Sequence, residues 1–276
     1  MKKKTGSVAS CGAVLYLGFR RSLTLGLTLV AAMLMMLVSS FRVSASVFPD
    51  ETLHYTVSYK WGIIHKDAAD ATLTLRRKGD LYNIRLTAKT QPWADRIFSV
   101  RDTLLSEVAI QGFKPRTYTK ISHEGGRYER DRIRYSYAGS VVKGSADRVV
   151  VRKDGTRSTD TRGLTSTGTA FDMLSVFYYI RLLDFDNMKS GTLYKTTVFS
   201  GSKAETLTIK MLGKEKLKLR DKSTREAYKL SFTFTSGGKK KSSDDIFAWI
   251  STDSSHIPLY LTGKLPVGEV RVYYRP

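Results

Sequence analysis

The chain has 276 residues, of which 41% are hydrophobic and 11% aromatic. This composition is enough for a sizeable core and excludes a disordered protein, because disordered chains lack the apolar surface that offsets chain entropy. The formal net charge of +21 favours polyanionic partners, or serves solubility alone. The single cysteine, Cys11, excludes disulfides and cysteine-based catalysis or metal binding in the rest of the chain.

The first 45 residues are predicted to be a signal peptide. A basic segment precedes a 16-residue apolar run, Leu23–Val38, which is shorter than the about 20 residues of a membrane-spanning helix. Val43 and Ala45 suit a signal-peptidase site, so cleavage is expected after Ala45, with an uncleaved membrane anchor as the alternative. Residues 46–276 keep 40 basic and 25 acidic residues, a net charge of +15. We therefore expect an exported protein in the periplasm or at the periphery of the outer membrane.

Apolar and polar side chains alternate over many short runs of the exported part. The alternation begins with Leu53 and Tyr55 and ends with Val270 and Val272. A period of two predicts strands with one buried and one wet face, which is typical of an antiparallel sheet. The sequence predicts a mainly β fold that forms a single domain over residues 46–276. Two β halves that divide near residues 155–190 are the alternative.

One segment departs from this alternation. Residues Phe171–Phe185 have apolar side chains at helical spacing, and Thr169 or Asp172 is expected to cap the start. A helix that is apolar all round is best buried on most sides. The sequence therefore predicts a curved antiparallel sheet or half-barrel wrapped around one apolar helix. The Gly-, Ser- and Thr-rich residues Asp154–Thr169 are predicted to form a loop.

Short motifs spread along the chain together resemble a known family. They are Phe48–Leu53, Tyr55, Tyr59, Trp61–Gly62, Ala68–Leu73, Asp102–Ser106, Pro115, Tyr118, Glu124–Gly126, Asp172–Arg181, Trp249–Asp253, Ile257–Pro258 and Val267–Gly268. As a set they are similar to the domain of unknown function 3108 family of uncharacterised exported bacterial β proteins. The resemblance implies a β protein of the envelope and supplies no activity. By analogy, its fold is that of the lipocalin-like half-barrels that carry lipid or lipoprotein between membranes.

Aromatic side chains of the predicted helix and inner strands are candidates for lining an apolar ligand cavity. They are Trp61, Phe171, Phe177, Tyr178, Phe232, Phe234 and Trp249. A packed core uses the same residue types, so the sequence alone does not separate a filled half-barrel from a hollow one.

Basic side chains at alternate strand positions are candidates for gripping an anionic head group at the rim of that cavity. They are Arg130, Arg132, Arg134, Lys216, Lys218 and Arg220. The planar fork of arginine holds phosphate through two hydrogen bonds. The alternative is a solvated sheet face, or edge lysines that prevent strands from aggregating. Glu129 and Asp131 share one strand face and are either an acid/base pair or ion-pair partners of nearby arginines.

No motif of the sequence indicates catalysis. The histidines His54, His65, His123 and His256 lack the spacing of metal ligands, and neither a GxSxG elbow nor a phosphate-binding glycine loop occurs. We predict no cofactor, no metal and no nucleic-acid partner. The leading hypothesis is a non-enzymatic protein of the cell envelope that binds a lipid, a glycolipid or an envelope protein, with peripheral membrane contact. The alternatives are a solid-core module that recruits a protein partner and, less favoured, a hydrolase of envelope glycan.

Overall fold

The computed structural model describes residues 48–236, 240–241, 246–264 and 268–276, and strands make up most of them. The predicted signal peptide, residues 1–45, lies outside this part of the chain. The first eight strands follow one another as antiparallel neighbours. They are β1 (Glu51–Trp61), β2 (Ile64–Lys78), β3 (Leu81–Thr90), β4 (Val100–Ala109), β5 (Lys114–Glu124), β6 (Arg127–Ala138), β7 (Val141–Val151) and β8 (Arg157–Thr167).

A second series of strands completes the sheet. It consists of β10 (Leu193–Ser200), β11 (Lys203–Lys218), β12 (Thr224–Ser236), β13 (Lys240–Lys241), β14 (Ile246–Ser251), β15 (Pro258–Lys264) and β16 (Glu269–Arg275). The connections of the first series contain the short helix α2 (Pro92–Asp95) and the 3-10 turn η1 (Gln111–Phe113). Among the described residues, no helix is long and apolar enough to cross a membrane.

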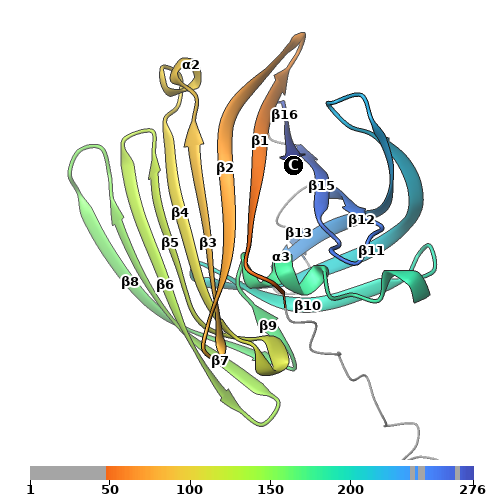
Figure 1. Ribbon diagram of the computed structural model, residues 1–276. Helices are drawn as coiled ribbons and strands as arrows, with labels where there is room; N and C mark the ends of the chain where they lie inside the picture. Colours follow the sequence, from red (N-terminus) through yellow and green to blue (C-terminus); the bar gives the residue numbers. More distant parts are fainter. Residues whose placement is uncertain (1–47, 237–239, 242–245, 265–267) are drawn as a thin grey trace, which may run out of the picture. The chain divides into compact units, whose positions relative to one another are not determined.

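Both series belong to a single sheet. Its order is β8-β7-β6-β5-β4-β3-β2-β1-β16-β15-β14-β12-β11-β10-β9, where β9 is Ala170–Phe171 and β13 pairs with β12 (Figure 1). The first and last strands are antiparallel neighbours, with Tyr55 of β1 opposite Tyr274 of β16. This pair joins the two series, so the predicted mainly β fold with a curved antiparallel sheet is confirmed.

The segment between the two series corrects the prediction of one long apolar helix. Residues Ala170–Phe171 form β9, which pairs in parallel with β10, and the helix α3 spans Ser175–Ile180 alone. A 3-10 turn, η2, follows at Phe185–Asn187. Leu174, which has no capping side chain, is the N-cap of α3, and the Oδ1 atom of Asp172 accepts the backbone N–H groups of Leu174 and Ser175 in the turn before the helix. The spacing of the apolar residues correctly predicted that this segment is buried. It did not reveal that Phe171 belongs to the strand β9 and that the helix begins only at Ser175.

The predicted loop over residues 154–169 is also wrong for most of its length. Arg157–Thr167 form β8, which pairs with β7 from Val151 opposite Arg157 to Val141 opposite Thr167. Most of the β8 side chains are exposed on both faces of the sheet. Because no apolar face is buried there, the sequence has no alternation that would reveal the strand.

Side chains from both series close the inner face of the sheet. Phe199 of β10 is fully buried and stacks on Tyr135 of β6 with ring centroids 5.4 Å apart. Gly144 of β7 makes room for that ring, because a Cβ atom there would come within 2.9 Å of it. At the edge, the Ser166 hydroxyl of β8 donates to Thr197 of β10 at 2.7 Å. Strand β10, near one end of the sheet, therefore packs on β6, β7 and β8 near the other end, and the sheet is nearly closed.

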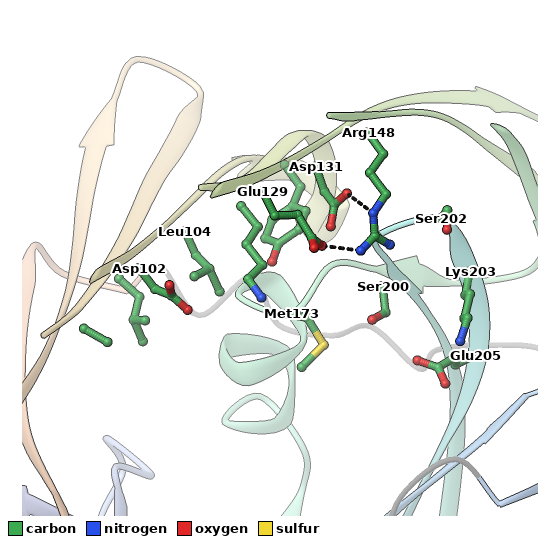
Figure 2. Close-up of a pocket in the computed structure, with 15 residues that line it drawn as sticks. Asp102, Leu104, Glu129, Asp131, Arg148, Met173, Ser200, Ser202, Lys203 and Glu205 are labelled. Carbon is green, nitrogen blue, oxygen red and sulfur yellow. Dashed lines mark hydrogen bonds and ion pairs between the residues drawn. The ribbon is translucent and has the colours of Figure 1, made fainter. Parts of the chain in front are cut away.

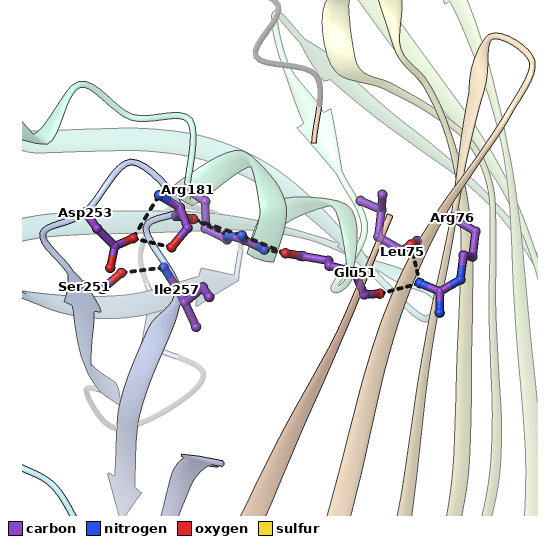
Figure 3. Close-up of polar contacts among 8 residues, drawn as sticks. Glu51, Leu75, Arg76, Arg181, Ser251, Asp253 and Ile257 are labelled. Carbon is purple, nitrogen blue, oxygen red and sulfur yellow. Dashed lines mark hydrogen bonds and ion pairs between the residues drawn. The ribbon is translucent and has the colours of Figure 1, made fainter. Parts of the chain in front are cut away.

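A buried ion pair fixes the segment that crosses between the series. Arg181, the residue after α3, donates to Glu51 of β1 at 2.5 Å, and its side chain is 1% exposed (Figure 3). It also donates to the carbonyl oxygen of Ser255, in the β14–β15 connection, at 2.9 and 3.0 Å. The guanidinium lies over the rings of Phe48 and Tyr178, 4.9 and 5.1 Å from their centroids. One side chain thus joins the crossing segment to both halves of the sheet.

Replacing Arg181→Ala should lower the free energy of unfolding by about 3–5 kcal/mol, because it leaves the buried Glu51 carboxylate without its counter-charge. The matched control is Arg275→Ala, whose exposed pair with Asp70 at 3.2 Å should contribute about 1 kcal/mol or less. Urea unfolding of both variants measures the difference. Equal losses for the two variants would contradict the role given to Arg181.

Candidate functional site

A pocket of about 560 Å³ lies on the inner face of the sheet, at the end where β10 turns into β11. Strands β3 to β7 form one wall, and the turn around Gly201 forms the opposite wall. Met173, which precedes α3, lies between the two walls in Figure 2. The pocket therefore lies where the two series of strands approach one another.

Strand register brings the charged side chains of the pocket together. Lys120 of β5 lies opposite Asp131 of β6, which in turn lies opposite Arg148 of β7. In the next row along the strands, Ser122 lies between Asp102 and Glu129. Directly opposed side chains on one face of a sheet are about 5 Å apart at Cβ, so each row forms a continuous polar strip.

Asp131 is the most enclosed charged group of the pocket. Its side chain is 7% exposed, and Arg148 Nε lies 3.6 Å from Oδ1, which is too long for a hydrogen bond. That oxygen has no hydrogen-bond partner among the described residues. Arg148 is instead held by Glu129, which accepts from it at 2.5 Å. Burial raises the pKa of Asp131, and the neighbouring Glu129 carboxylate raises it further, against the lowering effect of Arg148.

A second carboxyl pair lies beside the first. The Ser122 hydroxyl is 2.8 Å from Asp102 and 2.7 Å from Glu124. One hydroxyl has one proton, so the two carboxyl groups share a single hydrogen-bond donor. Burial, together with the charge of Glu124, raises the pKa of Asp102. The hydroxyl and Lys120 offset the burial of Glu124 and lower the pKa of that residue, so Asp102 takes up a proton more readily than Glu124 does.

The remaining lining of the pocket is partly apolar and partly charged. Leu86 and Ala88 of β3 and Leu104 of β4 are half-buried and face it, and the Met173 side chain is 39% exposed. From β11, Lys203 and Glu205 add charges of both signs. An apolar wall therefore adjoins a group of paired and unpaired charges.

The aromatic candidates from the sequence lie outside this pocket. Phe171, Tyr178 and Phe232 are buried in the main core, and Phe177 and Phe234 pack against it. The side chain of Trp61 lies outside the described part of the chain. The five described side chains fill space that the sequence left open as core or cavity, and none of the five lines the pocket beneath Gly201.

Trp249 belongs to a separate cluster and corrects the expectation of one shared cavity. It packs with Ala227 and Leu259, and its Nε1 donates to Glu215 at 2.6 Å. Leu217 of β11 also packs against this cluster. Ala248 and Ile250, the neighbours of Trp249, belong to the main core, so Trp249 lies on the other face of β14.

The basic candidates are exposed, and they do not line the pocket either. Arg130, Arg132 and Arg134 share the outer face of β6, as the alternation with Ile133 predicted, and Arg134 pairs with Asp147 at 2.6 Å. Lys216 and Lys218 are likewise exposed.

Arg220 has internal partners of its own. It donates to Asp67 at 2.6 Å and lies 4.1 Å above the Tyr273 ring. Its charge is therefore already neutralised by the protein, which makes it a poor candidate for an anionic head group.

Sequence reasoning named Glu129 and Asp131 as a pair but missed Asp102 and Arg148 as their neighbours. The sequence did contain a sign of Arg148. It lies two residues from the buried Ala146, and residues two apart in a strand share one face of the sheet, so alternation places Arg148 on the inner face of β7. Within the described part of the chain, no group of three or more His, Cys, Asp or Glu side chains is arranged to hold a metal ion. The carboxylates of the pocket are held by serine and arginine instead.

Comparison with known proteins identifies the family. The model of the family described as protein of unknown function (DUF3108) matches residues 54–275, so the chain belongs to that family and the resemblance seen in the sequence is confirmed. No curated protein matches the chain.

Among solved structures, the chain is similar to a β-barrel-like protein of domain of unknown function DUF1849 from Brucella abortus. The TM-score is 0.53 at 8% identity, over 82% of this chain and 95% of that one. At that identity, the likeness extends to the barrel-like fold alone.

Replacing Asp131→Asn should change stability by an amount that depends on pH. Because the folded-state pKa of Asp131 is raised, the folded protein binds more protons than the unfolded chain, and the associated stability is lost as pH rises through that pKa. The variant avoids this loss, so its stability relative to the unaltered protein should increase from acid to neutral pH.

The control is Asp147→Asn on the outer face of β7, where Arg134 lowers the pKa of Asp147. The stability from that aspartate is present above its unfolded pKa and is lost as pH falls, so the control should show the opposite trend. Urea unfolding over a pH series measures both. Parallel pH profiles for the two variants would show that Asp131 is not buried as described.

Proposed function

We propose that this member of the family is a non-enzymatic protein of the cell envelope that binds an amphipathic lipid or glycolipid in the pocket beneath Gly201. The observation that carries the proposal is Asp131, a side chain that is 7% exposed and has an Oδ1 atom without a hydrogen-bond partner among the described residues. A buried polar atom without a partner is costly unless a bound group or water completes it.

The size and lining of the pocket suit a ligand with an apolar part. Its volume of about 560 Å³ lies within the range of about 300–1,000 Å³ that is usual for small-molecule sites. Leu86, Leu104 and Met173 offer an apolar wall to one end of a ligand. Removing apolar surface from water favours such contact by about 25 cal/mol per Å².

The charges of the pocket support a head group of mixed charge. Lys120 and Arg148 already lie in ion pairs with Glu124 and Glu129. A ligand ammonium group would supply the hydrogen-bond donor that Asp131 lacks. Lys203, which is exposed at the edge of the pocket, is available to an anionic group of the same ligand.

The geometry of the carboxyl groups favours binding over glycan hydrolysis. Asp102 and Glu124 are both hydrogen-bonded to the hydroxyl of Ser122, at 2.8 and 2.7 Å. Glycosidases need two carboxyl groups on either side of the scissile bond, about 5 Å or more apart. Two carboxyl groups bridged by one hydroxyl leave no room for a sugar ring between them.

The export of the protein and its carrier role are part of the same proposal. The basic and apolar pattern of residues 1–45 supports export, and the family's sequence resemblance supports an envelope location. A half-barrel that shelters a lipid on its inner face is the carrier arrangement that the sequence suggested, and the pocket beneath Gly201 is the part of the inner face on which this proposal rests.

Lysophosphatidylethanolamine is a suitable probe because it combines one acyl chain with an ammonium and a phosphate group. Its affinity, measured by calorimetric titration, should fall at least about tenfold for Leu104→Arg, which fills the apolar wall with a charged side chain. The control is Leu105→Arg at the next residue, which is 39% exposed and faces the other side of the sheet. That variant should bind as the unaltered protein does.

A second pair of variants tests the head group. Asp131→Asn should weaken binding of lysophosphatidylethanolamine and spare lysophosphatidylglycerol, which has no ammonium group, whereas Asp147→Asn should affect neither lipid. Equal losses for Leu104→Arg and Leu105→Arg would contradict the site. If the unaltered protein binds no lipid, the proposal fails in favour of a solid-core module that recruits a protein partner.

A further inference from the structure

The connections between strands of the first series gather at one end of the sheet. In an antiparallel series, alternate connections leave from the same end, so β1–β2, β3–β4, β5–β6 and β7–β8 turn together. The tip of β1–β2 and the helix α2 both lie at the top of Figure 1. We call the set formed by Gly62–Ile63, Gln91–Ser99, Gly125–Gly126 and Arg152–Thr156 the loop rim.

Large apolar side chains at this rim are exposed to water. Ile63, at the tip of the β1–β2 hairpin, is 104% exposed. Ile97 and Phe98, between α2 and β4, are 78% and 52% exposed. The two tips are two strands apart in the sheet, a distance of about 10 Å at the usual spacing. The apolar groups are therefore separate points and do not form one continuous patch.

The protein holds the second tip outward through a network of hydrogen bonds. The backbone N–H groups of Ile97 and Phe98 both donate to the carbonyl oxygen of Ala94, at 2.9 and 2.8 Å. Phe98 also covers the β5–β6 turn, where a Cβ atom on Gly125 would come within 2.6 Å of its ring. The exposed side chains thus belong to an ordered turn.

The base of α2 is fixed to the neighbouring strands. Trp93 Nε1 donates to the carbonyl oxygen of Asp67 in β2 at 2.7 Å. Asp95 accepts two hydrogen bonds from Arg101 of β4, at 2.6 and 2.8 Å. These contacts keep Ile97 and Phe98 from turning back onto the sheet, although burying them there would be favoured by the hydrophobic effect. The ordered turn therefore presents Ile97 and Phe98 to solvent.

Basic side chains surround the apolar tips. The exposed ones are Lys60, Lys66, Lys89, Arg96, Arg127, Arg152 and Lys153. Among the acidic residues at this end, Asp95 and Glu124 are in ion pairs with Arg101 and Lys120, and Asp154 of the loop rim is exposed and accepts the backbone N–H of Thr156. The loop rim therefore presents apolar points within a field of positive charge.

We propose that the loop rim docks on an anionic lipid surface, with Ile63, Ile97 and Phe98 entering the boundary between head groups and acyl chains. Isolated apolar side chains ringed by lysine and arginine suit a bilayer, where each side chain enters separately and the cations pair with lipid phosphates. A protein partner would be expected to meet a continuous apolar patch. This surface is independent of the pocket, although both lie at the same end of the strands.

Flotation of the full chain with vesicles tests the proposal. The vesicles contain phosphatidylglycerol and phosphatidylcholine in equal amounts, or phosphatidylcholine alone. Binding should require the anionic lipid and should weaken as salt is added, because surface charges are then screened. The triple variant Ile63→Ser, Ile97→Ser, Phe98→Ser should lower the partition coefficient about tenfold or more.

The chain offers matched controls for both parts of the surface. Leu193→Ser removes another exposed apolar side chain, 55% exposed, which begins β10 at the opposite end of the sheet, and it should leave binding unchanged. Arg96→Gln with Lys66→Gln should weaken binding, whereas Lys216→Gln with Lys218→Gln should not. Equal binding to neutral and anionic vesicles, or equal losses for the rim and control variants, would overturn the proposal. Leu104→Arg, within the pocket, should not alter flotation.

Discussion

Arg181 carries its positive charge where 1% of its side chain is exposed, and it is stable there because Glu51 lies 2.5 Å away. Most strand pairs of the sheet are hairpins between consecutive strands and form from local sequence. The segment from β9 to η2 is different, since it must cross from one series to the other. By binding β1 and the β14–β15 connection together, Arg181 fixes this segment and with it Met173 at the pocket.

The inner face of the sheet changes character along its strands. One row contains the buried Ser106, Tyr118 and Ile133 and belongs to the core, and the next rows contain Asp102 and Asp131. Residues two apart in a strand point to the same face of the sheet. The alternation that places core residues on the inner face therefore places these charged residues there as well. Arg148 donates a hydrogen bond to Glu129, and Ser122 donates one to Asp102. Asp131 Oδ1 has no such donor among the described residues, so it is the atom to which a ligand can add a hydrogen bond.

Alternation in the sequence was sufficient for the features that depend on one strand at a time. It predicted the mainly β fold and the outward face of Arg130, Arg132 and Arg134. It failed where contacts come from distant strands. The exposed strand β8 has no apolar face to reveal it, and the separate cluster around Trp249 forms between side chains of β11, β12, β14 and β15. The pocket could not be predicted from the sequence for the same reason. Its two walls come together only because β10 packs against β6 and β7, which are distant in the sequence.

The central claim is that the inner face holds an amphipathic molecule. Native mass spectrometry of the protein, produced with its own leader and purified from the envelope without detergent, tests it most directly. The account predicts a stoichiometric extra mass that solvent extraction identifies as a lipid. A mass equal to that of the polypeptide alone, with no uptake of added lipid, would contradict the account and leave the fold as a solid-core scaffold.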